Sequence, residues 1–325
     1  LDRQTEAKEA REKAVQVYNQ TLSNNPEDGE TWFKMAEVLI SLNRREEAIA
    51  AYEKSIEMNS SKAGMAAITI SHLLAEAGRY DEALVASDMA LNLTSPDNVQ
   101  DMKLVLGIKG SILTEAARLE EALQVFDEAL KLDPRDRTSL MYRASVLKDL
   151  HRYNESAEAS QMAIELFSNE SNLWKTNAWI GKGDALNASG RKDEALEAYR
   201  SAVEVIELDI QENPENSRAW ERKGRALYKM DEYEEALEAF NKSIDLSTPS
   251  FAISSESYFA WDGRGDALLK LGRNEEALDA YRQAIELYPL NGDAWHGKGA
   301  ALQALGKRIE GDWAFQMAEK LGYRE

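Results

Sequence analysis

Apolar and polar residues follow a pattern that restarts every 34 residues along this chain, and residues 258–291 show it most clearly. In the first half of this stretch Trp261, Gly265 and Leu268 fall at i, i+4 and i+7, on one face of a helix. In the second half, small residues around Tyr281 repeat the same spacing. The stretch therefore predicts two short amphipathic helices, helix A and helix B, joined by a tight turn at a glycine.

The following unit repeats this one position by position. Identical residues recur 34 positions later at several sites, among them Trp261 and Trp295, Gly265 and Gly299, Leu268 and Leu302, and Gly272 and Gly306. Two helices of this length cannot bury both of their apolar faces alone, so each unit needs neighbours. A fixed period of this kind predicts a repeat protein.

The period and the order of residue types resemble the tetratricopeptide repeat, whose pattern is W…LG…Y…A…F…P. The resemblance implies an all-α fold, a right-handed α-solenoid or superhelix of helix-turn-helix repeats. A sel1-like or other helical-repeat family is the alternative, although the periods of those families usually differ. The regular LG/KG-x-AL and DEAL phrases resemble repeat proteins of archaea and bacteria.

The predicted array is one continuous solenoid domain over residues 1–325, with a leading half repeat and eight full units. The half repeat, 1–28, is a helix B preceded by the remnant of another helix. The full units, of which 176–216 is long, are 29–62, 64–97, 103–136, 137–170, 176–216, 217–250, 258–291 and 292–325.

Four steps between units exceed the period by five or seven residues. Seven residues make almost two helical turns, so the buried face is kept while a helix lengthens. After Ala195 the extra turns are expected to prolong helix B to Pro214, and after Ala236 they are expected to precede helix A, with Thr248-Pro249 as its start. The five-residue excesses near residues 96–101 and 168–175 favour loops or partial turns.

The charge of the chain narrows the class of partner. A net charge of −19 and a pI near 4.8 disfavour nucleic acid and anionic membrane surfaces. No apolar run approaches the roughly 18 residues of a membrane span, and no signal peptide is visible. A cytoplasmic location is favoured. Because the sequence begins with Leu rather than Met, we expect a fragment, and an upstream targeting segment stays an open alternative.

Residues for catalysis are scarce. The chain has no cysteine, and its three histidines, His72, His151 and His296, lie far apart without a partner at a metal-ligand spacing. The Gly-x-Gly pairs fall inside helix A, with no preceding strand of the kind a dinucleotide site requires. We therefore expect no enzymatic activity, no metal and no cofactor.

One helix A carries a basic stripe in this acidic chain. Arg218, Arg222, Arg225 and Lys229 follow at i, i+4, i+7 and i+11. The resemblance places this face on the concave groove that receives ligand, where the stripe and the neighbouring Tyr228 would clamp a carboxylate or an acidic peptide. The favoured alternative is that acidic residues on the flanking helices already pair with these arginines, and the two are compatible. Those acidic residues are Asp184, Asp262 and Asp266.

Other positions on the same face are apolar, and they indicate either a peptide groove or simple packing between neighbouring helices. They are Phe33, Met65, Ile68, Leu104, Ile108, Met141, Tyr142, Ile180, Tyr228 and Phe259. His296 falls on this face as well, as a surface residue or a ligand contact. The last helix carries more apolar residues than one preceding helix can cover. We therefore expect either that a further helix was removed or that another chain packs there, which would be self-association through the C-terminal helix.

These observations favour a protein–protein interaction scaffold that binds a peptide or protein segment on its concave helix-A face. The alternative is a recruitment or regulatory domain of a larger multidomain protein, an enzyme or a sensor, of which this chain is a fragment. The identity of the partner does not follow from these residues.

Overall fold

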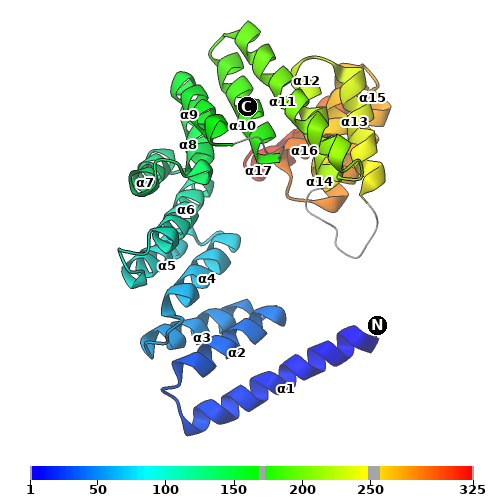
Figure 1. Ribbon diagram of the computed structural model, residues 1–325. Helices are drawn as coiled ribbons and strands as arrows, with labels where there is room; N and C mark the ends of the chain where they lie inside the picture. Colours follow the sequence, from blue (N-terminus) through cyan, green and yellow to red (C-terminus); the bar gives the residue numbers. More distant parts are fainter. Residues whose placement is uncertain (1, 168–172, 248–256, 324–325) are drawn as a thin grey trace. The chain divides into compact units, whose positions relative to one another are not determined.

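The computed structural model describes residues 2–167, 173–247 and 257–323, and its elements in these ranges are helices without any strand (Figure 1). The predicted all-α class is confirmed. The chain divides into two compact units, unit 1 over residues 1–152 and unit 2 over residues 153–325. That the two units form one continuous solenoid domain stays a prediction.

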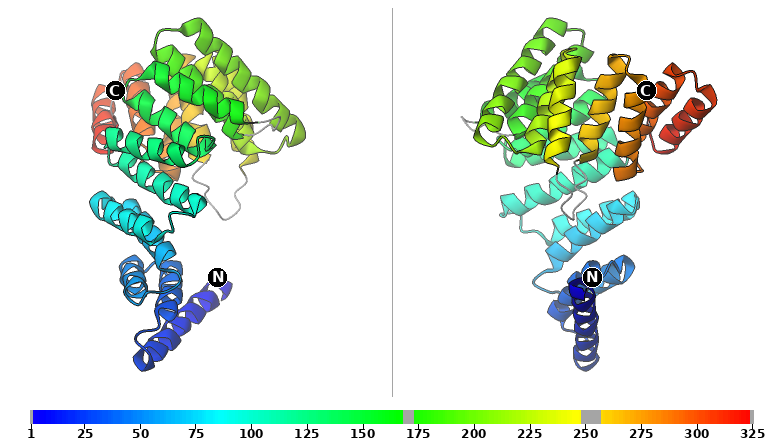
Figure 2. Two further views of the ribbon diagram at one scale, coloured as in Figure 1. Left: turned by 60° about the vertical axis from the view of Figure 1, so that its left-hand side comes forward. Right: turned by 90° about the vertical axis from the view of Figure 1, so that its right-hand side faces the viewer.

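Unit 1 holds a leading helix, three helix pairs and one further helix A (Figure 2). Within it α4, α6 and α8, the helices A of consecutive repeats, contact one another in a row. The helices are α1 (Asp2–Asn24), α2 (Gly29–Ser41), α3 (Arg45–Glu57), α4 (Ala63–Glu76), α5 (Tyr80–Leu93), α6 (Val99–Glu115), α7 (Leu119–Leu132) and α8 (Arg137–Asp149).

Unit 2 begins with a helix B and continues with four helix pairs, whose helices A, α10, α12, α14 and α16, form a second row of contacts. The helices are α9 (Tyr153–Leu166), α10 (Leu173–Ala188), α11 (Lys192–Glu212), α12 (Ser217–Lys229), α13 (Tyr233–Leu246), α14 (Ser257–Lys270), α15 (Asn274–Leu287), α16 (Gly292–Ala304) and α17 (Arg308–Lys320).

The lengths of α6 and α11 reflect the departures from the 34-residue period. α11 is a single helix of 21 residues, so the predicted prolongation of this helix B is confirmed. The excess before α6 becomes a partial turn, since α6 begins at Val99 and runs for 17 residues. The separate helix remnant expected before the first helix B is wrong, because α1 is one helix of 23 residues. The proposed start at Thr248-Pro249 lies outside the described residues.

A buried aromatic ring from helix B holds each of several repeats together. The ring of Phe240 lies so close to Gly224 of its own repeat that a Cβ there would come within 2.8 Å of it. The same ring would lie 2.4 Å from a Cβ on Gly263, in the helix A of the following repeat. Tyr281 sits between Gly265 and Gly297 in the same way. Each ring thus wedges its own helix A against the next one, and glycine supplies the space.

The tryptophan and proline of the repeat pattern are joined by a hydrogen bond. The indole Nε1–H of Trp220 donates to the backbone carbonyl of Pro214 over 2.9 Å, and Trp295 donates to Pro289 over 3.0 Å. The proline ends the preceding helix B, and its exposed carbonyl receives the side chain that begins the following helix A. The bond explains why these two residue types recur together.

The last helix differs from the earlier helices B on the face that would meet another helix A. Leu278 and Ile285 of α15 belong to the core shared with α16, whereas the corresponding residues of α17 are Asp312 and Glu319, both exposed. Of the apolar residues expected to be surplus there, Met317 and Leu321 pack against the core. Ile309 and Trp313 stay exposed, at 88% and 52%.

Self-association through the C-terminal helix stays a prediction, and the structure narrows it to the patch around Ile309 and Trp313. We expect the sedimentation coefficient to rise with protein concentration, and Ile309→Glu to abolish that rise by placing a charge in the apolar contact. Lys320→Glu, on the same helix, is the matched control and should sediment like the wild type. A wild-type chain that stays monomeric at high concentration would contradict the prediction.

Candidate functional site

The predicted basic stripe lies on α12, in the row of helices A of unit 2. Two of its arginines, Arg222 and Arg225, contact a carboxylate that the sequence analysis did not name. The Arg222 guanidinium contacts the carboxylate of Glu221, and the Nε atom of Arg225 lies 4.0 Å from Glu221 Oε1. Glu221 is only 4% exposed, and the sequence analysis missed it because it precedes an arginine in a mixed-charge helix. At the end of the stripe, Lys229 Nζ lies 3.3 Å from Asp184 Oδ1, so this aspartate pairs with the lysine of the stripe, whereas the sequence analysis expected it to pair with an arginine.

Arg218, at the start of the stripe, lines a small cavity of about 130 Å³. Arg222, Glu221 and Phe259 line it as well, together with serines of α12, α13 and α14. The cavity therefore combines two guanidinium groups with hydroxyl groups and one aromatic ring. These are groups that can bind a carboxylate or another small anion.

Two of the predicted aspartates hold the aromatic wedge of their own repeat. Asp184 Oδ1 accepts a hydrogen bond of 2.8 Å from the hydroxyl of Tyr199, and Asp266 Oδ1 accepts one of 2.6 Å from Tyr281. Burial and the neighbouring carboxylate raise the pKa of both tyrosines, which therefore donate as neutral phenols. Each aspartate directly follows the glycine on which the ring lies. A Gly-Asp step opposite a helix-B tyrosine is the sequence signal of this bond.

Asp262 lies one turn before Asp266 on α14 and is less well satisfied. Its Oδ1 atom is enclosed, and no hydrogen-bond partner reaches that atom among the described residues. Burial raises the pKa of Asp262 to about 8, and the carboxylates of Asp266 and Asp293 add to the rise, whereas Asn291 opposes it. Burial also raises the pKa of Asp266, against the hydrogen bond from Tyr281. Adjacent acidic groups in one partly enclosed place are a feature of functional surfaces.

The other predicted site residues are distributed over both units. Tyr228 is half-buried beside Asp266, and its ring centre lies 5.5 Å from that of Tyr233. His296 stacks on Tyr323 with 4.2 Å between ring centres, so it packs within the C-terminal repeat rather than beside the basic stripe. Tyr142 belongs to unit 1, where it lines a groove between helices A.

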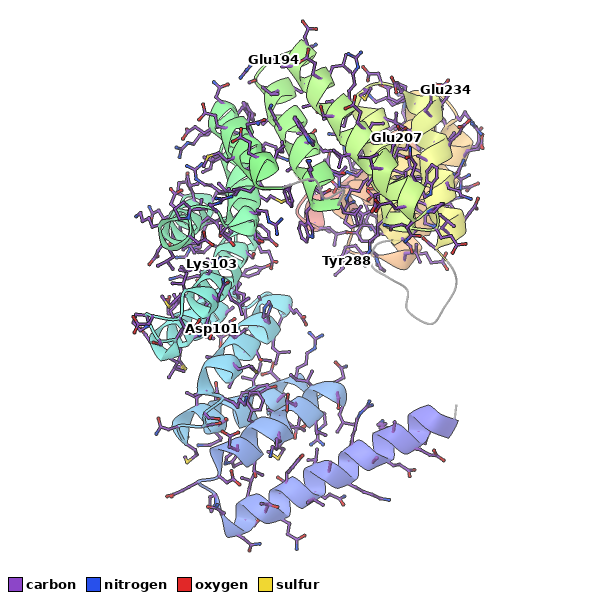
Figure 3. All side chains as sticks on the ribbon, viewed as in Figure 1. Asp101, Lys103, Glu194, Glu207, Glu234 and Tyr288 are labelled. Atoms are coloured by element: carbon purple, nitrogen blue, oxygen red, sulfur yellow. The ribbon has the colours of Figure 1, made fainter. Side chains whose placement is uncertain are left out.

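This groove of unit 1 has a volume of about 570 Å³, larger than the cavity of about 130 Å³ at Arg218. Three consecutive helices A build it, and Lys103, labelled in Figure 3, lies at the start of the middle one, α6. The lining residues are His72, Ala75 and Glu76 of α4; Gln100, Lys103, Leu104, Gly107, Ile108, Ser111, Ile112 and Glu115 of α6; and Asp136, Thr138, Ser139 and Tyr142 of α8 or its N-terminus.

The apolar residues predicted on the helix-A face divide into two groups. Phe33 and Ile180 are buried, so packing accounts for them. Others keep much of their side chain in solvent, as expected of a binding surface: Met65 is 54% exposed, Leu104 55%, Tyr142 43% and Phe259 43%. The groove of unit 1 therefore has an apolar floor that the helix packing does not use.

The histidines contribute no cluster. His72 lies in the groove of unit 1, whereas His151 occupies a turn with a φ of 59°. Within the described residues no three His, Asp or Glu side chains come together as a metal would require. None of the described helices combines the length and the apolar composition that crossing a bilayer demands.

Family models match repeats in both units. Models described as tetratricopeptide repeat match residues 29–62, residues 109–171 and 175–210, and residues 215–290, together more than half of the chain. No curated protein matches the sequence.

Solved structures share the fold at low sequence identity. A tetratricopeptide repeat protein from Parabacteroides merdae ATCC 43184 is 16% identical over 84% of this chain and 98% of its own, with a TM-score of 0.61. The APC/C hetero-tetramer Cut9–Hcn1 gives 14% identity over 95% of this chain and 56% of the matched chain, with a TM-score of 0.53. At these identities the likeness shows the fold alone.

The matched models, the paired helices and the aromatic wedges agree on an all-α solenoid. Repeats of this type generally serve as scaffolds for protein–protein interaction, through the extended surfaces that stacked units create. The chain belongs to the tetratricopeptide repeat family.

Proposed function

We propose that this chain is an interaction scaffold that binds a peptide or protein segment along its helix-A faces. The groove of unit 1 carries the proposal. Three consecutive helices A line a volume of about 570 Å³ there. Leu104 and Tyr142 remain about half exposed in it, although neighbouring apolar residues of the same helices are buried. A groove of this form suits a peptide that inserts side chains at fixed spacing.

The charged face on the helices A of unit 2 supports a second contact region. Glu221 positions the guanidinium groups of Arg222 and Arg225, and the side chain of Arg225 remains 41% exposed. An arginine that is held by one carboxylate retains N–H donors for another. We propose Arg218, Arg222, Arg225, Tyr228 and Lys229 as the ligand-binding residues of this region, with Asp184, Asp262 and Asp266 as their acidic frame.

Mechanism in this proposal means presentation rather than chemistry. The wedged repeats hold the helix-A side chains at fixed spacing, so the cost of ordering the surface is met during folding and not on binding. The acidic surface of the chain, with a net charge of −19, opposes nucleic acid and anionic membranes as partners. The alternative is that the same faces recruit a partner for a larger multidomain protein of which these repeats form a part.

A displayed library of random peptides tests the proposal, and peptides of about 12 residues suffice to span a groove of this type. We expect the full chain to select peptides whose binding slows amide hydrogen exchange on helices A and leaves helices B unchanged. Peptides that bind through unit 2 should lose about tenfold or more in affinity with Arg222→Glu plus Arg225→Glu. The control is Arg200→Glu plus Lys242→Glu, the same charge change on exposed positions of helices B. Protection confined to helices B would contradict the proposal.

The raised pKa of Asp262 predicts how the free energy of unfolding depends on pH. Because its pKa is raised from 3.8 to about 8, the folded chain holds a proton that the unfolded chain releases within this interval. The free energy of unfolding contributed by this residue therefore falls as the pH rises from about 4 to about 8.

We expect Asp262→Asn to remove this fall and to raise the melting temperature more at about pH 9 than at about pH 5, by removing a penalty on the order of 1–3 kcal/mol. Thermal unfolding of both proteins at the two pH values measures it. Asp279→Asn, an exposed position paired with Arg282, is the control and should leave the pH dependence unchanged. An equal gain at both pH values, or a loss at both, would count against a raised pKa at Asp262.

A further inference from the structure

Gly107 stands apart from the glycines that receive an aromatic ring. At Gly110, on the same helix, a Cβ would come within 2.5 Å of the Phe126 ring, so packing requires glycine there. At Gly107, one turn earlier, a Cβ would meet no atom of the described residues within 4 Å. Glycine in a helix interior is less stable than alanine, because it loses more backbone freedom on folding. Packing within the chain therefore gives no reason for glycine at this position.

The groove of unit 1 does give a reason. Gly107 lies on its lining, between Leu104 and Ile108 of the same helix. The ring of Tyr142 borders the groove as well and is fixed by stacking on Phe126, with ring centres 5.5 Å apart and planes at 7°. A side chain at position 107 would project into the space between these groups. Glycine keeps the middle of the groove open for something that approaches the backbone of α6.

The charges around the groove are unequal. Among the described residues that line it, Lys103 is the one lysine or arginine. Its ammonium is held by two carboxylates, Asp133 at 2.7 Å and Asp136 at 3.1 Å. At the other end of α6, the lining residues are Glu76, paired with Arg45 at 3.0 Å, and Glu115. His72 and Tyr142 are the remaining titratable side chains on the lining. The groove is thus apolar in its middle and acidic at the Glu115 end.

We infer that the groove of unit 1 binds a segment of a partner protein in which a large apolar side chain lies over Gly107 and a lysine or arginine meets Glu115. The inference rests on the proposed scaffold function and specifies its ligand. Eight residues of helix separate the two positions, about 12 Å along α6. An extended peptide covers this distance in about three or four residues. The segment therefore carries its cation three or four residues from its apolar anchor.

Peptides selected from the displayed library by the chain of residues 1–325 test this inference. We expect the selected sequences to share an apolar residue with Lys or Arg three or four positions away. Gly107→Leu should fill the groove and weaken a labelled peptide of this type by about tenfold or more in fluorescence anisotropy. Gly107→Ala should weaken binding less and raise the melting temperature, because a helix gains from alanine while nothing in the chain obstructs its methyl group.

Two further variants keep the test decisive if Gly107→Leu fails to fold. Leu104→Asp alters a side chain that is 55% exposed and should weaken binding without changing the helical circular dichroism. Glu115→Lys should weaken the cationic peptide about tenfold and favour a peptide with Glu in place of its Lys. Gly110→Ala serves as the contrasting control at a packing glycine and should lower the melting temperature.

Each other outcome overturns the inference in a distinguishable way. Peptides that bind every unit 1 variant like the wild type, yet lose affinity with Arg222→Glu plus Arg225→Glu, would leave the scaffold function standing and remove this groove as the site. Selection of acidic peptides that bind unit 1 would contradict the assigned charge. A library that yields no binding peptide would count against both the groove and the proposed function.

Discussion

The stacking of the repeats depends on an aromatic ring of helix B that packs directly against glycines of helix A. Phe240 and Tyr281 are almost completely buried, and each lies against glycines of two consecutive helices A. The ring therefore fixes both the pairing inside a repeat and the stacking on the following repeat. Since interiors are close-packed, a single added methyl group at these glycines has no room without a shift of the ring or the helix. A small set of residues thus sets the geometry of a long surface.

The part of each helix A that does not take part in this packing is available for binding. The wedge and the small residues occupy one side of helix A, and the groove-facing side beside it carries different residues in different repeats. In unit 1 that side is apolar and hollow at Gly107, whereas in unit 2 it carries a basic stripe framed by carboxylates. Burial raises the pKa of the enclosed Asp262 on this side, so ionisation of its carboxyl group opposes folding as the pH rises. Such groups are retained where function requires them.

Much of the fold follows from the sequence, because the 34-residue spacing places the same residue types in the same environment repeatedly. The regular spacing of Trp295 and Pro289, and of Tyr281 and Gly265, can be seen in the sequence itself. The site was predicted less completely. The stripe from Arg218 to Lys229 could be placed on one face, but its central partner Glu221 could not, since a glutamate among arginines carries no signal of burial.

Two further features required the structure for a physical reason. The sequence does not distinguish a glycine that packs against an aromatic ring, such as Gly110, from one that no described atom approaches, such as Gly107. Only the contacts with other helices show the difference. His296 could be assigned to helix A from its spacing, yet its stacking on Tyr323 depends on how the chain returns after α17. Spacing within a repeat predicts which face a residue takes, and contacts between elements decide what it does there.

The most direct test of the account is a double-mutant cycle between a wedge and its glycine. Gly224→Ala should lower the free energy of unfolding by about 1–3 kcal/mol, because its methyl group meets the ring of Phe240. In a chain that already carries Phe240→Leu, the same substitution should cost much less, which gives a coupling of about 0.5 kcal/mol or more. Denaturant unfolding of the four proteins measures this coupling. If the losses in free energy of unfolding were additive, Gly224 and Phe240 would not be coupled. That result would contradict the claim that the ring holds the helices together by packing against glycine.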